Sequence, residues 1–290
     1  MQITKPLKRR ALIKKLGLAA AASSTLALTG CGSGGSSGSS ASSGNSASST
    51  GGSSNNSTNT TQWLSGGTDA MEVTFPPTSD PLDLSLGNVI CTNTGTRSYT
   101  LGPCYFPADD YRSDISEGEP GVPMTLAMKL IDADCNPIVG ADIEVWWCNW
   151  EGIYSGNDTG TNNPYSFSTG FCTSNDADAL QAKWFRGVQT TDSEGNVYFL
   201  GCFPGWYPSR TTHIHFRVVI NNVERLVSQF CFDDDLCDDI YLSHSDYTGT
   251  TKDTRNSTDN VFSSDFGEYQ FIVERQSDGS MLAYKAIQLI

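Results

Sequence analysis

From Val122 onward, apolar and polar residues alternate in short runs that are rich in Val, Ile, Phe, Tyr and Thr. Alternation with a period of two places successive side chains on opposite faces, which is typical of β-strands. The runs are VPMTLAMKLIDAD, ADIEVWWC, GVQTTDSEGNVYFL, HIHFRVVINNVERLVSQFCF and EYQFIVERQSDGSMLAYKAIQL. Turn-forming residues separate them, and no convincing amphipathic helix interrupts them. The pattern predicts an all-β fold, either an antiparallel β-sandwich or a barrel.

Of the two, we expect the antiparallel β-sandwich, of immunoglobulin-like or prealbumin-like type, with long loops. Three of the runs contain a turn signal and read as hairpins. Their turns fall at Asp192–Gly195, at Asn221 with Asn222, and within the last run.

Two segments do not fit the strand pattern. Residues 68 to about 110 are rich in Pro, Asp, Thr and Gly and predict an irregular lead-in that wraps the domain. The polar insert Ser155–Ala182 is too long for a simple hairpin loop. It is either a functional lid or an ornament that Cys172 pins through a disulfide, and the sequence does not distinguish the two.

The first 30 residues have the composition of an export signal, with a basic start and a short apolar stretch. Arg9 and Arg10 match the twin-arginine pattern, although Lys8 stands where Ser or Thr is usual. The end of this stretch, Leu28–Cys31, resembles the lipobox of bacterial lipoproteins, in which the cysteine is acylated. The alternative is an ordinary signal peptide that contains a cysteine.

A Gly/Ser/Asn tract with nothing to bury follows Cys31, which favours a flexible tether behind a lipid anchor. The predicted organisation is therefore a signal peptide at 1–30, a lipidated tether at 31–67 and a folded domain at 68–290. Such a protein is extracytoplasmic and lipid-anchored, in the periplasm or on the cell surface of a bacterium. Its contact with the membrane is expected through the lipid on Cys31 only.

Beyond Cys31, eight cysteines remain, and an even number behind an export signal predicts up to four disulfides. A zinc site is disfavoured because no CxxC pair occurs. Without residues 1–30 the chain keeps 12 basic and 32 acidic residues, a formal charge of −20. This charge excludes nucleic acid and anionic membrane surfaces as partners.

Two of the three histidines, His213 and His215, stand one residue apart in a predicted strand. They share a face with Arg217, whereas Ile214 and Phe216 lie on the other face. Two such imidazoles, about 6 to 7 Å apart at their Cα atoms, can converge on one metal ion. The alternative is a pair of histidines that only form hydrogen bonds on the strand face.

Further ligands of such a metal would have to come from elsewhere in the chain. The candidate oxygen donors are Tyr207, Tyr154 and the acidic run Asp233–Asp235. A phenolate is a hard, strongly donating anion that suits Fe(III), whereas zinc sites are usually built from Cys, His and carboxylates.

In this order, the segments WWCNWEGIYSG, WFRGVQTTDSEGN, FPGWYPSRTTHIHFRV and RLVSQF resemble the catalytic core of the intradiol ring-cleavage dioxygenases. The resemblance is to the protocatechuate 3,4-dioxygenase-like, secreted single-chain branch and covers roughly residues 99 to 265. It implies cleavage of a catechol-type aromatic ring between its two hydroxylated carbons with O2, giving a muconate-type diacid. It also implies non-haem Fe(III) as the cofactor and a small aromatic diol as the substrate.

The resemblance assigns a role to six residues. It implies that Tyr154, Tyr207, His213 and His215 bind the iron, with Tyr207 and His215 as the axial pair. Arg210, three residues before the first histidine, would stand beside the bound substrate, and Gln229 would lie near the active site. Tyr207 would also take a proton from the catechol when the substrate displaces it.

Other residues are given less specific interpretations. Cys104 and Cys202 are expected to be disulfide partners, and Trp146, Trp147 and Trp150 to be core or pocket wall. His244 is expected at the surface, and Asp233–Asp239 in a solvated loop, with a calcium site as the alternative although the spacing fits no EF-hand.

Two other functions remain open at this stage. One is a cell-surface β-sandwich binding module without catalysis. The other is a zinc or copper hydrolase or oxidase that uses the same histidines. The identity of the catechol and the oligomeric state are not predicted.

Overall fold

The computed structural model describes residues 62–89, 91–107, 110–156, 167–247 and 249–290, all within the unit Thr60–Ile290. The predicted signal peptide, Cys31 and the tether up to residue 61 lie outside the described residues. Residues 62–67 contact the rest of the unit: Leu64 N donates to the carbonyl of Gly279 at 2.8 Å, and Gly67 N donates to that of Gly121 at 3.2 Å.

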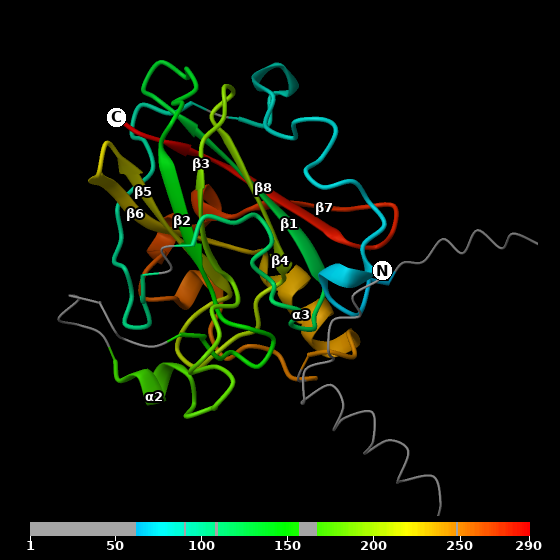
Figure 1. Ribbon diagram of the computed structural model, residues 1–290. Coiled ribbons are helices and arrows are strands. Elements are labelled where there is room, and N and C mark those ends of the chain that lie inside the picture. Colours follow the sequence, from blue (N-terminus) through cyan, green and yellow to red (C-terminus); the bar gives the residue numbers. More distant parts are fainter. Residues whose placement is uncertain (1–61, 90, 108–109, 157–166, 248) are drawn as a thin grey trace, which may run out of the picture. The chain divides into compact units, whose positions relative to one another are not determined.

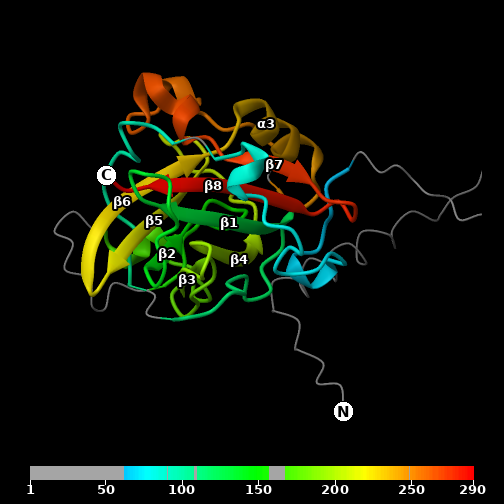
Figure 2. The same cartoon turned by 90° about the horizontal axis from the view of Figure 1, so that it is seen from above.

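In the described part of the chain, two four-stranded sheets make up the fold, as Figures 1 and 2 show. The strand order is β4-β1-β8-β7 in one sheet and β3-β2-β5-β6 in the other. The strands are β1 (Pro123–Ile131), β2 (Asp142–Trp146), β3 (Arg186–Thr190), β4 (Asn196–Cys202), β5 (His213–Ile220), β6 (Val223–Cys231), β7 (Ile272–Arg275) and β8 (Met281–Gln288). The prediction of an all-β fold is confirmed.

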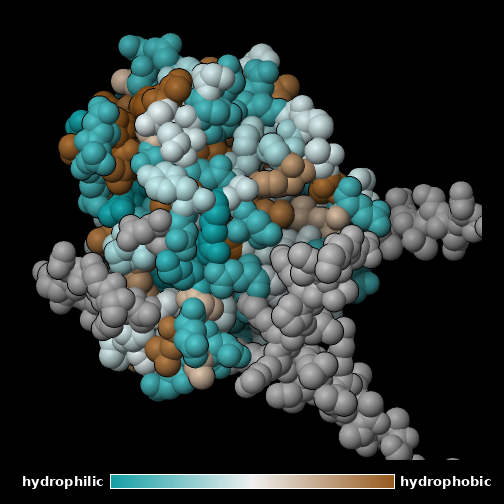
Figure 3. Space-filling model, viewed as in Figure 1, coloured by the Kyte–Doolittle hydropathy of each residue, from teal (hydrophilic) through white to brown (hydrophobic). Residues whose placement is uncertain are grey.

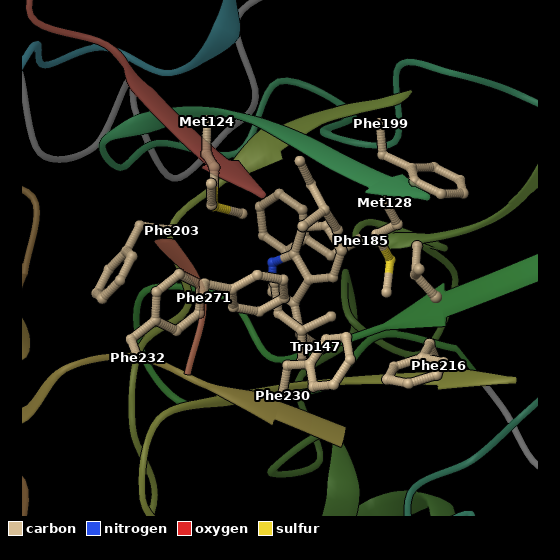
Figure 4. Close-up of a cluster of buried hydrophobic side chains, with 14 of the residues drawn as sticks. Met124, Met128, Trp147, Phe185, Phe199, Phe203, Phe216, Phe230, Phe232 and Phe271 are labelled. Atoms are coloured by element: carbon tan, nitrogen blue, oxygen red, sulfur yellow. The ribbon is translucent and has the colours of Figure 1, made fainter. Parts of the chain in front are cut away.

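Buried apolar side chains from both sheets form one hydrophobic cluster (Figure 4). Met124 and Met128 come from β1, and Phe216 and Phe230 come from the paired strands β5 and β6. Burial of one such side chain contributes about 1.5–3 kcal/mol, so this cluster is the main source of stability. On the surface seen in Figure 3, hydrophobic and hydrophilic residues are interspersed.

The strand pairings confirm two of the three predicted hairpins. β5 pairs with β6 across Asn221 and Asn222, whose positive φ angles of 52° and 61° make the tight turn. β7 pairs with β8 in the same antiparallel manner.

The predicted hairpin around Asp192–Gly195 is wrong. β3 pairs with β2, whereas β4 pairs with β1 in the other sheet. Asp192 closes the turn between them by accepting from the backbone N–H groups of Glu194 and Asn196. A turn of this kind reverses the chain but does not decide which sheet the next strand joins. The prediction of purely antiparallel sheets is also wrong, because β1 and β8 are parallel.

The acidic stretch Asp233–Asp239, predicted as a solvated loop, instead begins the helix α3 (Asp234–Ser243). The Asp233 side chain caps it by accepting from the N–H groups of Asp235 and Leu236. Carboxylates in the first turn also interact favourably with the helix dipole. The other short helices are α2 (Thr169–Cys172), η1 (Thr68–Ala70), η2 (Leu84–Leu86), η3 (Asn256–Thr258) and η4 (Ser263–Tyr269).

Four of the eight cysteines form the disulfides Cys91–Cys135 and Cys104–Cys172, which confirms the prediction for Cys104. The second bond pins the insert that carries Cys172. The prediction for Cys202 is wrong, because it is a buried free thiol, as are Cys148, Cys231 and Cys237. Burial raises the pKa of Cys148 and of Cys237 to about 12, so both thiols stay protonated at neutral pH.

His244 is buried, which contradicts its expected place at the surface. Its Nε2 lies 3.0 Å from the carbonyl oxygen of Leu64 and 3.0 Å from Ser65 Oγ. The segment around Leu64 covers this histidine. Because the segment is rich in Gly and Ser, its sequence gives no sign of a contact with the domain. Among the described residues, the helices are all too short or too polar to cross a membrane.

Candidate metal centre

The two predicted tyrosines and the two predicted histidines meet at one place beside β5. Tyr154 Oη lies 3.4 Å from Tyr207 Oη, and Tyr207 Oη lies 3.0 Å from His213 Nε2. His213 Nε2 in turn lies 3.1 Å from His215 Nε2. Two oxygens and two nitrogens from three separate segments therefore converge.

Close backbone packing brings the two tyrosine loops together. Gly152 has a φ of +79°, and a Cβ there would lie 2.1 Å from the carbonyl oxygen of Trp206, next to Tyr207. Only glycine permits this approach. The backbone N–H of Tyr154 donates to the carbonyl of Cys172 at 3.0 Å, which ties the tyrosine to the disulfide-bonded insert.

The hydrogen bonds of His213 identify the nitrogen that faces the centre. Its Nδ1 lies 2.6 Å from the carbonyl oxygen of Thr211. Because a carbonyl oxygen only accepts, Nδ1 carries the proton and Nε2 points a lone pair at Tyr207 and His215. Burial lowers the pKa of His213 to about 3 and, together with the charge of His213, that of His215 well below its usual range. Both imidazoles are therefore neutral.

The ring of His215 lies between two neighbours. The indole of Trp146 stacks on it, with ring centroids 5.1 Å apart and planes at 9°. Gly102 lies against it, since a Cβ at that glycine would be 2.8 Å from His215 Cε1. The expectation that these tryptophans are core or pocket wall is met by burial: Trp146 belongs to a smaller cluster of buried side chains and Trp147 to the main hydrophobic core.

The pKa values of both phenols are raised. Burial raises the pKa of Tyr207 to about 12 and raises that of Tyr154 well above its usual range. Without a bound metal ion, both phenols therefore keep their protons at neutral pH.

The structure also brings Arg210 and Gln229 to the centre. Arg210 Nη1 lies 3.4 Å from His213 Nε2, and Arg210 Nη2 donates to Gln229 Oε1 at 2.6 Å. Arg210 Nε donates to Asp259 Oδ2 at 2.9 Å, and the N–H of Thr211 donates to the same oxygen at 2.8 Å. The buried carboxylate thus fixes the guanidinium. The sequence analysis missed Asp259, because nothing in a single Asp on an irregular segment indicates its partner.

The acidic candidates Asp233 and Asp234 are engaged elsewhere. Asp233 caps α3, and Asp234 pairs with Lys252 and accepts from the N–H of Asn256. Within the described ranges, no three side chains of His, Cys, Asp and Glu gather in a way that could hold a metal ion. The centre becomes a four-ligand site only when the two phenol oxygens are counted.

The donor set fits a trivalent metal ion. Two neutral imidazoles present lone pairs, and two phenols become hard anionic ligands once a cation compensates the cost of burying their charge. Without a metal, His215 Nε2 can donate to the lone pair of His213 Nε2 at 3.1 Å, whereas a bound cation would accept a lone pair from both nitrogens. As a metal-free cluster, the same four groups would have little physical reason to be buried together.

A family model described as "Dioxygenase" matches residues 102–275. The chain is 27% identical over 147 residues to a hydroxyquinol 1,2-dioxygenase of a Rhizobium species, covering 48% of each chain. It is 27% identical over 157 residues to a catechol 1,2-dioxygenase of Candida albicans, covering 46% of each chain. The chain thus spans about half the length of the curated relatives it matches.

One solved structure matches over more of its length. It is an intradiol ring-cleavage dioxygenase from Tetranychus urticae, with 26% identity and a TM-score of 0.56. The match covers 66% of this chain and 92% of that one. Residues 102–275, which the family model matches, contain all four converging donors.

Proposed function

The chain belongs to the intradiol ring-cleavage dioxygenase family, and from that premise we propose that it is an oxidoreductase that cleaves a catechol-type aromatic ring. The ring opens between its two hydroxylated carbons with incorporation of both atoms of O2, and the product is a muconate-type diacid. The observation that carries this proposal is the convergence of Tyr154, Tyr207, His213 and His215 beside the fixed cation Arg210.

These four residues would hold one non-haem Fe(III). Bound ferric iron supplies a Lewis acid that draws electron density from a chelated catecholate and makes its ring carbon reactive toward O2. The two phenolates offset part of the trivalent charge, and the neutral imidazoles complete the ligand set.

Tyr207 is the ligand best placed to move a proton. It is partly exposed, whereas Tyr154 is only 3% exposed. The raised pKa of Tyr207 without a metal means that its phenolate, once free of the metal, would be a strong base, and Tyr207 Oη would accept a proton from a catechol hydroxyl. The more deeply buried Tyr154 would remain as the anionic ligand.

Arg210 supplies electrostatic stabilisation. Asp259 and Gln229 hold its guanidinium beside His213, so the charge does not have to reorganise when the substrate ring becomes negatively charged. Gln229 acts as a polar support for Arg210 in this proposal.

The visible spectrum of the purified chain with ferric iron tests the proposal, before and after the addition of catechol under argon. We expect a broad tyrosinate-to-iron band that moves to longer wavelength with catechol, followed by ring-cleaved product when O2 is admitted. A chain that binds iron without colour, or binds none, would contradict the two-tyrosine site. A cell-surface binding module would then be the better reading.

We also propose that the two sheets form a β-sandwich, since side chains of both meet in one hydrophobic cluster. Export and lipid anchoring through Cys31 belong to the same proposal. The two disulfides support it, because disulfides persist in oxidising compartments. Replacement of Cys31 by Ala should release the protein from the membrane fraction in cells, whereas replacement of the nearby Ser33 should not.

A further inference from the structure

Arg186, the first residue of β3, is a buried arginine that the proposed mechanism does not use. It is 1% exposed. In the strand register, Arg186 of β3 is paired with Trp146 of β2, and Trp146 is paired with His215 of β5. His215 is in turn paired with Gln229 of β6. These four residues form one transverse row across the sheet β3-β2-β5-β6, and the row leads to the metal centre.

The guanidinium of Arg186 holds three backbone carbonyls around Tyr154. Its Nε donates to Ser155 O at 2.9 Å, its Nη1 to Phe106 O at 3.2 Å and its Nη2 to Cys104 O at 2.9 Å. Ser155 follows Tyr154 directly. Cys104 is bonded to Cys172, whose carbonyl accepts from the N–H of Tyr154. The contacts of Arg186 thus fix the Tyr154 backbone from both sides.

Arg186 forms no salt bridge with a carboxylate among the described residues. Glu144 is near enough to act on its charge but is paired with Arg217. The two nearby arginines are paired, Arg210 with Asp259 at 2.9 Å and Arg217 with Glu144 at 2.8 Å. The guanidinium faces two aromatic rings, with its Cζ 5.0 Å from the ring centroid of Phe106 and 5.8 Å from that of Tyr154, and of the two only Tyr154 can become an anion. A buried charge without a counter-charge is costly, and carbonyl hydrogen bonds only partly offset that cost. An anionic Tyr154 provides the missing charge.

We propose that Arg186 is a positioning residue of the metal centre, which holds the Tyr154 ligand in place and balances its charge. The inference rests on the proposed function, because it concerns Tyr154 as an iron ligand. It assigns the two arginines different tasks: Arg210 faces the substrate side, and Arg186 supports the ligand that stays bound.

The test is the affinity of the full chain for ferric iron supplied as its nitrilotriacetate complex, followed by the tyrosinate band. We expect R186Q to bind iron about 10- to 100-fold more weakly, as is usual when a residue that orients a metal ligand is removed. The band should move to longer wavelength, because removal of a positive charge beside Tyr154 makes electron transfer from its phenolate easier. R186K keeps the positive charge but cannot form all three hydrogen bonds to the carbonyls. It should therefore lose iron affinity without this band shift.

A double-mutant cycle separates positioning from general damage. The loss caused by R186Q should shrink to within about twofold in a Y154F background and persist in a Y207F background. R112Q is the matched control: Arg112 donates to the Arg186 carbonyl at 2.9 Å but contacts no proposed ligand, so its affinity should stay within about twofold of wild type. If R186Q does not fold, R186K in the same two backgrounds carries the comparison.

Equal losses in the Y154F and Y207F backgrounds would overturn the inference, as would wild-type affinity and an unshifted band in R186Q. In both cases the wild-type chain still binds iron and the proposed function stands. A wild-type chain that binds no ferric iron overturns the proposed function and the inference together.

Discussion

The sheet β3-β2-β5-β6 has two faces that are equally buried but chemically opposite. On β5, Ile214 and Phe216 point into the hydrophobic cluster, and His213 and His215 point to the other face, where the four proposed metal ligands converge. All four are at most 3% exposed. The same backbone therefore carries an apolar face that stabilises the fold and a polar face that carries the chemistry.

The difference between the faces lies in what burial costs. Apolar side chains gain free energy when they leave water, whereas polar side chains lose it unless each donor and acceptor finds a partner. On the polar face, buried atoms without a hydrogen-bond partner include Trp146 Nε1, His215 Nδ1 and Arg217 Nε. Such unpaired groups lower stability, so function is the physical reason for their presence on this face.

The largest predicted effect comes from two adjacent residues of β5. Phe216→Ala should lower the free energy of unfolding by about 3–5 kcal/mol, because it removes a buried aromatic ring and leaves a cavity. His215→Ala should leave the metal-free fold far less affected and lower iron affinity at least about 100-fold. Denaturant unfolding and iron titration of both variants check this. Equal losses of stability would contradict the division between the faces.

Arg210 gives the next largest effect. Arg210→Gln should lower kcat about 100- to 1000-fold, because it removes the fixed charge that stabilises the transition state. The tyrosinate band should remain, since Arg210 is not a ligand. The matched control is Arg97→Gln, in which an exposed Arg–Asp pair of 3.2 Å is removed and kcat should not change. A loss of colour in Arg210→Gln would show that Arg210 acts on iron binding instead.

Acid should destabilise the metal-free chain through the polar face. The folded pKa of His213 is about 3 and the unfolded value 6.5, so the unfolded state binds the extra proton between these pH values. The stabilisation is complete above pH 6.5 and falls by about 1.4 kcal/mol per pH unit for this group below it, about 2 kcal/mol by pH 5. Denaturant unfolding at several pH values measures this slope. His213→Gln should lower the slope but leave the contribution of His215, whose pKa is also lowered, and an unchanged slope would contradict the burial of a neutral His213.

The polar face could be predicted from the sequence to a large extent. A period of two placed His213 and His215 together, and the resemblance selected Tyr154 and Tyr207 from the candidate oxygen donors. Asp259 and Arg186 could not be found in this way. Asp259 contacts Arg210, 49 positions away, and Arg186 contacts Ser155, 31 positions away. No local sequence pattern indicates contacts at such separations.

The sheet assignments failed for a similar reason. The turn at Asp192 was read correctly, but the partner of β4 is β1, which precedes it by a long stretch of chain. Such pairings are set by how the apolar faces pack and not by the turn. α3 was missed because four aspartates conceal its buried positions Cys237, Ile240 and Tyr241, which recur at helical spacing.

α3 provides the smallest predicted effect. Asp233→Ala should lower the free energy of unfolding by about 1 kcal/mol, because it removes the cap on the N–H groups of Asp235 and Leu236. Asp239→Ala, an exposed change on the same helix, should stay within about 0.5 kcal/mol. Tyr241 of α3 donates to the carbonyl of Pro204 at 3.1 Å and lies 2.7 Å from Thr212 Oγ1, next to His213. Only the end of the helix is loosened by the loss of its cap, so iron affinity in Asp233→Ala should equal that of the wild type. A weaker affinity would mean that the polar face depends on this helix as well as on its own hydrogen bonds.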